Sequence, residues 1–280
     1  MRIIILGSTG YLGSKLVHKL LENNHELLCI IRKESNLRNL ENVLDDITLC
    51  TINDLESILC KKEYDCIINL ACKYSRDHVD EDVFEANFYN PLTLMIKCIR
   101  HNIDKIITID TGLINDLNAY SFSKSILSET LRWYCRQNVN LSVLNIKLEN
   151  YYGKDEPTNR FIPQTIIKLK NNEKIPLTDG KQIRDFIYVQ DVVDNLYNLI
   201  ISDCDFGFHN VPLGTGNGVS IKELITYLKE ITGSESELCF GAIEKRKGEP
   251  DSVADRNIMN KYNINIKYDW KQGMKLLVGE

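Results

Sequence analysis

The sequence lacks the cysteine patterns of disulfide-rich and zinc-binding domains. Its nine cysteines are odd in number, no two have the CxxC spacing, and several lie inside apolar runs such as 26–32 and 64–71. Reduced, buried thiols of cytosolic proteins are distributed in this way. We therefore expect a cytoplasmic protein with neither a disulfide framework nor a metal site.

Long apolar runs and clusters of basic residues are also missing. No run approaches the roughly 20 residues that cross a bilayer, and Gly7 and Gly10 interrupt the first run before it could serve as the apolar part of a signal peptide. The 34 basic and 39 acidic residues give a net charge of -5, and most basic residues stand singly or in pairs. Because nucleic acids and anionic membranes bind clustered positive charge, we expect a small-molecule partner, with no nucleic acid and no membrane.

What is present is the composition of a large globular protein. Hydrophobic residues make up 43% and charged residues 26% of the 280 residues, without any low-complexity block, which excludes a disordered or fibrous chain. This length is near the upper limit for one hydrophobic core, so one large domain or two unequal lobes is expected.

Strands alternate with helices through the first half of the chain. Residues 2–6 form a bounded apolar run, and residues 11–22 carry an apolar stripe at helical spacing. Further apolar runs follow at 26–31, 65–70, 105–109 and 141–146, separated by segments long enough for helices. This alternation predicts an α/β fold, a Rossmann-type doubly wound parallel sheet covered on both faces.

The character of the chain changes after Gly153, where residues 154–160 are polar and Thr178, Asp179 and Gly180 mark a turn. We expect a smaller C-terminal, substrate-binding lobe, with a helix at 189–201 packing back on the first lobe. The predicted cofactor domain consists of residues 1–150, and residues 185–212 are expected to pack back on it. The predicted substrate lobe consists of residues 151–184 and 213–280.

A glycine-rich turn follows the first predicted strand and opens the first predicted helix. Glycine permits a tight turn and a close approach of backbone N–H groups to a pyrophosphate, which also lies at the positive end of the helix dipole. The spacing is GxxGxxG, and an ordinary βα turn could share it. In this context it predicts dinucleotide binding by Gly7, Thr9, Gly10, Tyr11, Leu12 and Gly13.

Arg32 and Lys33 stand at the end of the second predicted strand, where NAD-binding proteins place an acid on the adenosine ribose. A guanidinium favours a 2′-phosphate through charge and two-pronged geometry. We therefore expect NADP(H) in preference to NAD(H), although a solvated loop pair would look the same.

Tyr120 and Lys124 lie one helical turn apart in a segment predicted to be helical, so they share a face. A neighbouring ammonium and a cationic nicotinamide stabilise a phenolate, which makes tyrosine a useful proton donor near neutral pH. A Tyr–Lys pair alone is common by chance, but after the glycine-rich N-terminus it predicts a catalytic pair.

With these motifs in place, the chain resembles the extended short-chain dehydrogenase/reductase family, in its branch of nucleotide-sugar epimerases, dehydratases and reductases. The resemblance runs along nearly the whole chain. It includes Ile67 to Ala71, Asn87, Asn150 to Gly153, Phe161 to Pro163 and Arg184 to Val189.

The resemblance implies roles for further residues. Leu70, Ala71 and Asn87 would contact the cofactor, as would Tyr120 and Lys124. Thr111 would polarise the substrate carbonyl, and Asn150, Arg184 and Arg246 would bind the diphosphate of a nucleotide sugar. For Arg184 a surface ion pair, and for Arg246 a solvated basic run, are the alternatives. A homodimer formed through the helix at 119–135 is also implied, although apolar positions of this kind more often belong to the core.

The two residues after Thr111 narrow the choice of reaction. Family members that eliminate water have an Asp-Glu pair there, whereas this chain has Gly112 and Leu113. Segments 177–186 and 248–255 resemble the CDP-abequose and CDP-paratose synthases. The resemblance thus implies NADPH-dependent reduction of the 4-keto group of a nucleotide-linked deoxy sugar for a surface polysaccharide. An NAD-dependent 4-epimerase and a non-catalytic dinucleotide-binding scaffold or redox sensor remain alternatives.

Overall fold

The computed structural model describes residues 1–75, 80–113, 117–137, 140–245, 248 and 250–279. The chain forms two compact units. The first consists of Met1–Lys147 and Val193–Val211, and the second of Leu148–Val192 and Pro212–Glu280.

A seven-stranded sheet forms the centre of the first unit, in the order β10-β6-β5-β4-β1-β2-β3. The pairs β1–β2, β1–β4, β2–β3 and β4–β5 are parallel. The strand order reverses at β1, as in a doubly wound sheet, and the predicted Rossmann-type fold is confirmed. The strands are β1 (Arg2–Leu6), β2 (Glu26–Ile30), β3 (Thr48–Cys50), β4 (Cys66–Asn69), β5 (Lys105–Thr111), β6 (Ser142–Leu148) and β10 (Gly207–Leu213).

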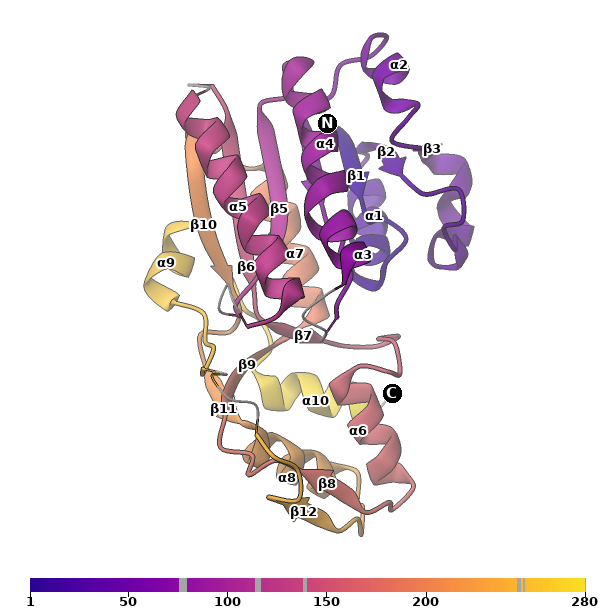
Figure 1. Ribbon diagram of the computed structural model, residues 1–280. Coiled ribbons are helices and arrows are strands. Elements are labelled where there is room, and N and C mark those ends of the chain that lie inside the picture. The colour runs from indigo at the N-terminus through magenta and orange to yellow at the C-terminus, as the bar shows by residue number, and fades with distance from the viewer. Residues whose placement is uncertain (76–79, 114–116, 138–139, 246–247, 249, 280) are drawn as a thin grey trace. The chain divides into compact units, whose positions relative to one another are not determined.

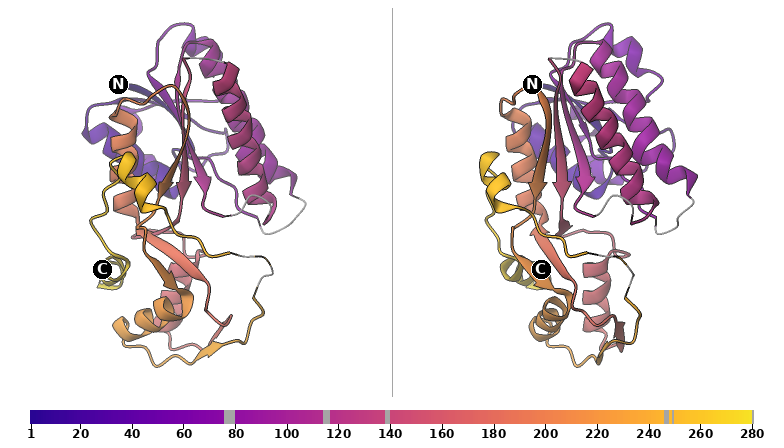
Figure 2. Two further views of the ribbon diagram at one scale, coloured as in Figure 1. Left: turned by 90° about the vertical axis from the view of Figure 1, so that its left-hand side faces the viewer. Right: turned by 60° about the vertical axis from the view of Figure 1, so that its left-hand side comes forward.

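Helices cover both faces of this sheet. Helices α4 and α5 lie on one face, and α1 and α7 lie on the other (Figures 1 and 2). Helix α4 has a proline in its first turn, where the missing N–H leaves no hydrogen bond unmade. The helical elements are α1 (Tyr11–Glu22), a 3₁₀ helix (Arg38–Asp46), α2 (Leu55–Leu59), α3 (Glu81–Phe84), a π-helical turn (Glu85–Tyr89), α4 (Asn90–Arg100), α5 (Ala119–Gln137) and α7 (Val189–Ile201).

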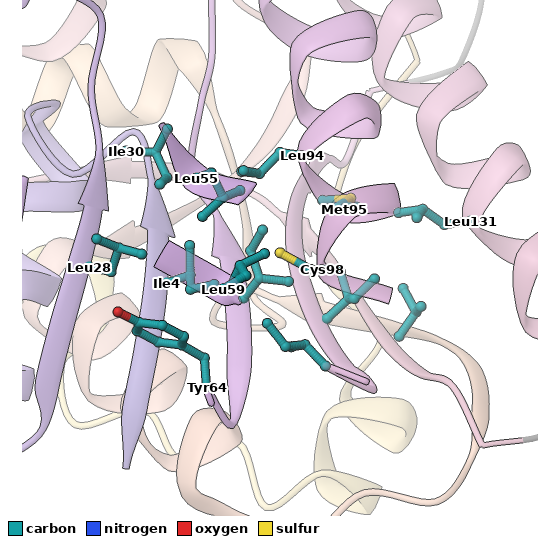
Figure 3. Close-up of a cluster of buried hydrophobic side chains, with 14 of the residues drawn as sticks. Ile4, Leu28, Ile30, Leu55, Leu59, Tyr64, Leu94, Met95, Cys98 and Leu131 are labelled. Atoms are coloured by element: carbon teal, nitrogen blue, oxygen red, sulfur yellow. The ribbon is translucent and has the colours of Figure 1, made fainter. Parts of the chain in front are cut away.

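One core cluster of the first unit lies between the sheet and helices α4 and α5 (Figure 3). Ile4 of β1 packs in one cluster with Leu94 and Met95 of α4 and Leu131 of α5, all of them fully buried. Burying a side chain of this size contributes roughly 1.5–3 kcal/mol. The apolar stripes of the helices and the apolar runs of the strands therefore hold the ends of β4 and β5 in place.

The second unit has a three-stranded sheet, β11-β9-β7, and a parallel pair, β12-β8. Its own core gathers around Tyr152, Leu169, Phe186 and Leu224. Its elements are β7 (Asn150–Tyr152), α6 (Phe161–Lys170), β8 (Ile175–Leu177), β9 (Ile183–Tyr188), β11 (Gly218–Ser220), α8 (Ile221–Ile231), β12 (Leu238–Phe240), α9 (Arg256–Lys261) and α10 (Trp270–Gly279).

All nine cysteines lie in the described segments and carry free thiols. Within those segments, no helix combines the length and the apolar character needed to cross a membrane. Burial raises the pKa of the Cys29 thiol to about 11, which keeps this sulfur in its unreactive form at neutral pH.

Candidate active site

The glycine loop between β1 and α1 packs against the backbone of the residues that follow β4. Gly7 has a φ of +87°, and a Cβ atom there would lie 2.7 Å from the backbone nitrogen of Ala71. A Cβ atom at Gly13 would lie 2.0 Å from the carbonyl oxygen of Gly7. Both positions thus require glycine. Gly10 is the N-cap residue of α1. The loop presents backbone at the positive end of a helix, which suits a pyrophosphate.

The end of β2 exposes the predicted basic pair. The Arg32 side chain is 79% exposed, and its Nε lies 3.6 Å from the Glu34 carboxylate. The Arg32 backbone N–H donates to Ser35 Oγ at 2.9 Å, and Lys33 is exposed as well. Asn39, which the sequence patterns did not single out, donates from Nδ2 to the Thr9 carbonyl at 3.0 Å and ties the 3₁₀ helix to the glycine loop.

The end of β4 is shaped by a buried asparagine. Asn69 donates from Nδ2 to Thr108 Oγ1 at 3.0 Å and accepts at Oδ1 from the Ala71 N–H at 3.1 Å. This turns the chain at Leu70 and Ala71 toward Gly7. The structure therefore brings together the glycine loop and these two predicted cofactor contacts.

Lys124 is buried at the carboxyl ends of two strands. Its side chain projects from α5, the residue is only 3% exposed, and Nζ donates to the carbonyls of Ala71 at 3.0 Å and Ile109 at 2.7 Å. An ammonium has three N–H donors, so two are used in fixing its position. Tyr120 lies one turn earlier on α5, as the spacing predicted.

Thr111 is the last residue of β5 and is buried. Its Oγ1 accepts from the Leu113 N–H at 3.2 Å, and its own N–H donates to Asp110 Oδ1 at 2.7 Å. In the bond from Leu113 the hydroxyl oxygen acts only as an acceptor. The O–H of Thr111 can therefore donate to another group.

Asn87 lies in the π-helical turn before α4, with no exposed surface. Its Oδ1 accepts from the Lys73 N–H at 2.8 Å, and its Nδ2 donates to the Lys73 carbonyl at 2.8 Å and to Ser123 Oγ at 3.3 Å. The amide thus joins the segment after β4 to α5. Its predicted contact with the cofactor stays a prediction.

The predicted diphosphate-binding residues belong to the second unit. Asn150 is exposed on β7. Arg184 is 5% exposed on β9, where Nη1 donates to the carbonyls of Ile183 at 2.7 Å and Pro250 at 2.8 Å. Arg246 lies outside the described residues.

Two buried carboxyl groups lie near Arg184. Asp185 accepts from the backbone N–H groups of Thr215, Gly216 and Ala254. Glu149 accepts at both oxygens from Ser252 Oγ, at 2.9 and 2.8 Å. Burial raises the pKa of Glu149 to about 7, with a smaller contribution from the charge of Asp185.

Residues 3–206 match the family described as NAD dependent epimerase/dehydratase family. The chain belongs to this family. The membership expected from the motifs is confirmed, and the protein is an enzyme of that family.

Several curated members of the epimerase/dehydratase family are similar over the whole chain. The CDP-abequose synthase of Salmonella typhimurium is 28% identical, and that of Salmonella muenchen is 24% identical, each over 99% of this chain and 97% of the relative. A protein named putative UDP-glucose 4-epimerase, from Methanocaldococcus jannaschii, is 26% identical over the same shares.

Solved structures of the family share this fold. The UDP-glucose 4-epimerase of Thermotoga maritima, solved with UDP-glucose, has a TM-score of 0.86 at 22% identity, covering 100% of this chain and 98% of its own. The dTDP-glucose 4,6-dehydratase of Bacillus anthracis, solved with NAD, has a TM-score of 0.84 at 18% identity, covering 100% and 96%.

The sequence patterns did not single out four residues that lie beside Thr111 and Tyr120. Asp110, Asn145 and Lys147 meet beside Thr111, and Tyr74 contacts Tyr120. The available signal was the occurrence of Asn145 and Lys147 two positions apart in a mostly apolar strand, because side chains at that spacing point to the same face.

Proposed function

We propose that this protein reduces the 4-keto group of a nucleotide-linked deoxy sugar with NADPH. The observation that carries the proposal is the position of Lys124, one turn from Tyr120 and bound to the ends of both β4 and β5, with Thr111 two residues beyond the Ile109 carbonyl. The full-length similarity to CDP-abequose synthases supports a nucleotide-sugar substrate.

The residues present fit a phosphorylated dinucleotide. Gly7 and Gly13 leave the loop without side chains that would block a pyrophosphate. The exposed Arg32 supports NADPH over NADH, since a guanidinium pairs well with a 2′-phosphate. When bound, NADPH supplies the hydride that reduces carbon 4.

Tyr120 is the acid in this reaction. It protonates the oxygen on carbon 4 as negative charge develops there, and the Lys124 ammonium stabilises the phenolate that remains. Thr111 donates a hydrogen bond to the same oxygen. The bond from the Leu113 N–H uses Thr111 Oγ1 as an acceptor only, so it leaves the O–H of Thr111 to act as the donor.

Diphosphate binding would hold the sugar in register for this step. Asn150, Arg184 and Arg246 are the candidates. Arg184 donates from Nη1 to the carbonyls of Ile183 and Pro250, and these bonds fix the position of its guanidinium on β9.

Reduction is favoured over dehydration and epimerisation by two features. Gly112 and Leu113 occupy the places of the acid and base found in dehydratases that the chain resembles. An epimerase regenerates its cofactor, whereas a reductase must exchange it, and the basic end of β2 favours the phosphorylated form. Epimerisation stays the second candidate, because a protein named putative UDP-glucose 4-epimerase is similar in sequence over 99% of this chain.

The deciding experiment mixes the purified protein with NADPH or NADH and a panel of 4-keto nucleotide sugars, including a CDP-4-keto-3,6-dideoxyhexose, and follows the absorbance of the reduced nicotinamide. We expect NADPH to be consumed with at least one keto sugar. Interconversion of 4-hydroxy isomers without net consumption would assign the epimerase activity instead. Binding of NADPH without turnover of any substrate would refute both.

A further inference from the structure

A buried polar cluster lies directly behind Thr111. Its centre is Asp110, which is 4% exposed. The carboxylate accepts from the Thr111 N–H at 2.7 Å, from Asn145 Nδ2 at 2.9 Å and from Lys147 Nζ at 2.5 Å. A buried carboxylate is tolerated only with such partners.

The cluster also reaches the helix that carries Tyr120 and Lys124. Asn145 Nδ2 lies 3.2 Å from Ser128 Oγ and 2.9 Å from Asn210 Oδ1. Ser128 stands one turn after Lys124, so it shares a face of α5 with that lysine. Side chains of β5, β6, β10 and α5 are thereby joined around one carboxylate.

Lys147 is accessible from outside the protein. A polar cavity of about 210 Å³ is lined by Ser125, Ser128, Glu129, Arg132, Lys147 and Asn210. The Lys147 side chain is 27% exposed, whereas that of Asp110 is 3% exposed. The cation thus separates the buried carboxylate from this cavity.

We propose that Asp110 and Lys147 are a positioning pair for Thr111. The Asp110 carboxylate accepts the Thr111 backbone N–H and so fixes the backbone there, and the Lys147 ammonium pairs with that carboxylate and holds it in place. The inference rests on the proposed reduction, in which the Thr111 hydroxyl must meet the developing oxyanion at hydrogen-bond distance. Small displacements of such a donor cost large factors in rate.

The test uses chemical rescue of Lys147→Ala. Removing the side chain joins its space to the cavity and leaves Asp110 without its cation. We expect kcat to fall at least about tenfold, with the dissociation constant for NADPH, measured by fluorescence, changed less than about twofold. Added methylammonium or ethylammonium should restore kcat severalfold, whereas ethanol, which is similar in size but neutral, should not.

Two variants serve as controls for the rescue. Asp110→Asn should also lose activity, but amines should not restore it, because no carboxylate remains to bind them. Lys105→Ala removes a lysine at the opposite end of β5, where Nζ binds the Ile200 and Ser202 carbonyls. It should keep the kcat of the unmodified protein and show no response to amines.

A second measurement does not depend on activity. In Lys147→Met, which keeps most of the side-chain length, the Thr111 amide should exchange its hydrogen at least about tenfold faster in NMR, because its acceptor is less well fixed. Unchanged exchange, or full kcat in folded Lys147→Ala, would overturn the positioning role. If the unmodified protein reduces no keto sugar but the exchange rate responds as expected, the proposed function fails and the pairing of Asp110 with Lys147 stands.

Discussion

The rings of Tyr74 and Tyr120 are in contact, with centroids 5.2 Å apart and planes inclined by 59°. Tyr74 is half exposed, and its backbone follows Lys73, whose N–H and carbonyl are both held by Asn87. The segment after β4 therefore brings an aromatic side chain against the predicted catalytic phenol.

Removing this ring should slow the reaction modestly. A tilted aromatic pair contributes about 0.5–1.5 kcal/mol beyond its buried area, so we expect Tyr74→Leu to lower kcat/KM by roughly two- to tenfold. Tyr74→Phe is the matched control, because it keeps the ring and loses only the hydroxyl. Steady-state kinetics in which the leucine and phenylalanine variants behave alike would show that the ring contact has no role.

Tyr120→Phe should abolish most of the turnover while leaving cofactor binding intact. Loss of a positioned acid costs about 10²- to 10⁴-fold, so kcat should fall by at least about 10²-fold. The NADPH affinity of the variant, measured by fluorescence titration, checks that the fold and loop are preserved. Near-normal turnover in this variant would exclude Tyr120 as the proton donor.

Arg32→Ser should weaken NADPH selectively. A hydrogen bond to a charged group contributes about 1.5–3 kcal/mol, which for this exposed side chain predicts a rise of about tenfold in KM for NADPH and little change for NADH. Arg100→Ser, at an exposed position on α4, controls for net charge. Equal effects of Arg32→Ser on both cofactors would argue against a 2′-phosphate contact.

Glu149 should make the second unit less stable as the pH rises. Its folded pKa of about 7 lies above the ordinary 4.5, so the folded protein binds more protons than the unfolded chain between these values. Its stabilising contribution is complete below about pH 4.5 and is lost as the pH rises toward 7, at up to about 1.4 kcal/mol per pH unit.

The measurement is urea unfolding between pH 5 and about pH 8, comparing the parent chain with Glu149→Gln. The glutamine variant should have a shallower downward slope, because Glu156, whose pKa burial also raises to about 7, keeps its own contribution, and it should be the more stable of the two at the upper end of the range. Glu235→Gln, at an exposed position of the same unit, should change nothing. A difference between parent and Glu149→Gln that stays constant with pH would contradict the prediction.

The homodimer expected from the resemblance can be tested on α5. Trp133 and Phe122 expose 54% and 47% of their surfaces there, and exposed aromatic side chains favour an interface. We expect light scattering to give a dimer for the parent chain and a monomer for Trp133→Glu. A monomeric parent chain would refute this assembly.

Much of the first unit could be predicted from local patterns. The apolar runs at 2–6, 26–31, 65–70, 105–109 and 141–146 correspond to β1, β2, β4, β5 and β6, and the helix expected at 189–201 is α7. These elements are long or strongly apolar, so periodicity identifies them. The three-residue strand β3 was missed, because so short a segment carries too little pattern.

The support of the site could not be predicted in the same way. Lys124 was identified by its spacing from Tyr120, but its two carbonyl partners, Ala71 after the end of β4 and Ile109 in β5, are 53 and 15 residues away. Asp110 and Lys147 are likewise brought together only by the order of strands in the sheet. Contacts of this kind depend on tertiary packing, which spacing along one segment does not report.

The π-helical turn at Glu85–Tyr89 has a consequence for engineering. A wider turn of this kind accommodates one residue more than a regular α-helix would. Deleting a single residue there would restore ordinary winding between α3 and α4 and, with these two helices kept in place, would turn the remaining side chains of the bulge by up to about 100° around the helix axis. Asn87 could then no longer reach Lys73 and Ser123 together, so grafts and deletions in this enzyme should leave the length of that turn untouched.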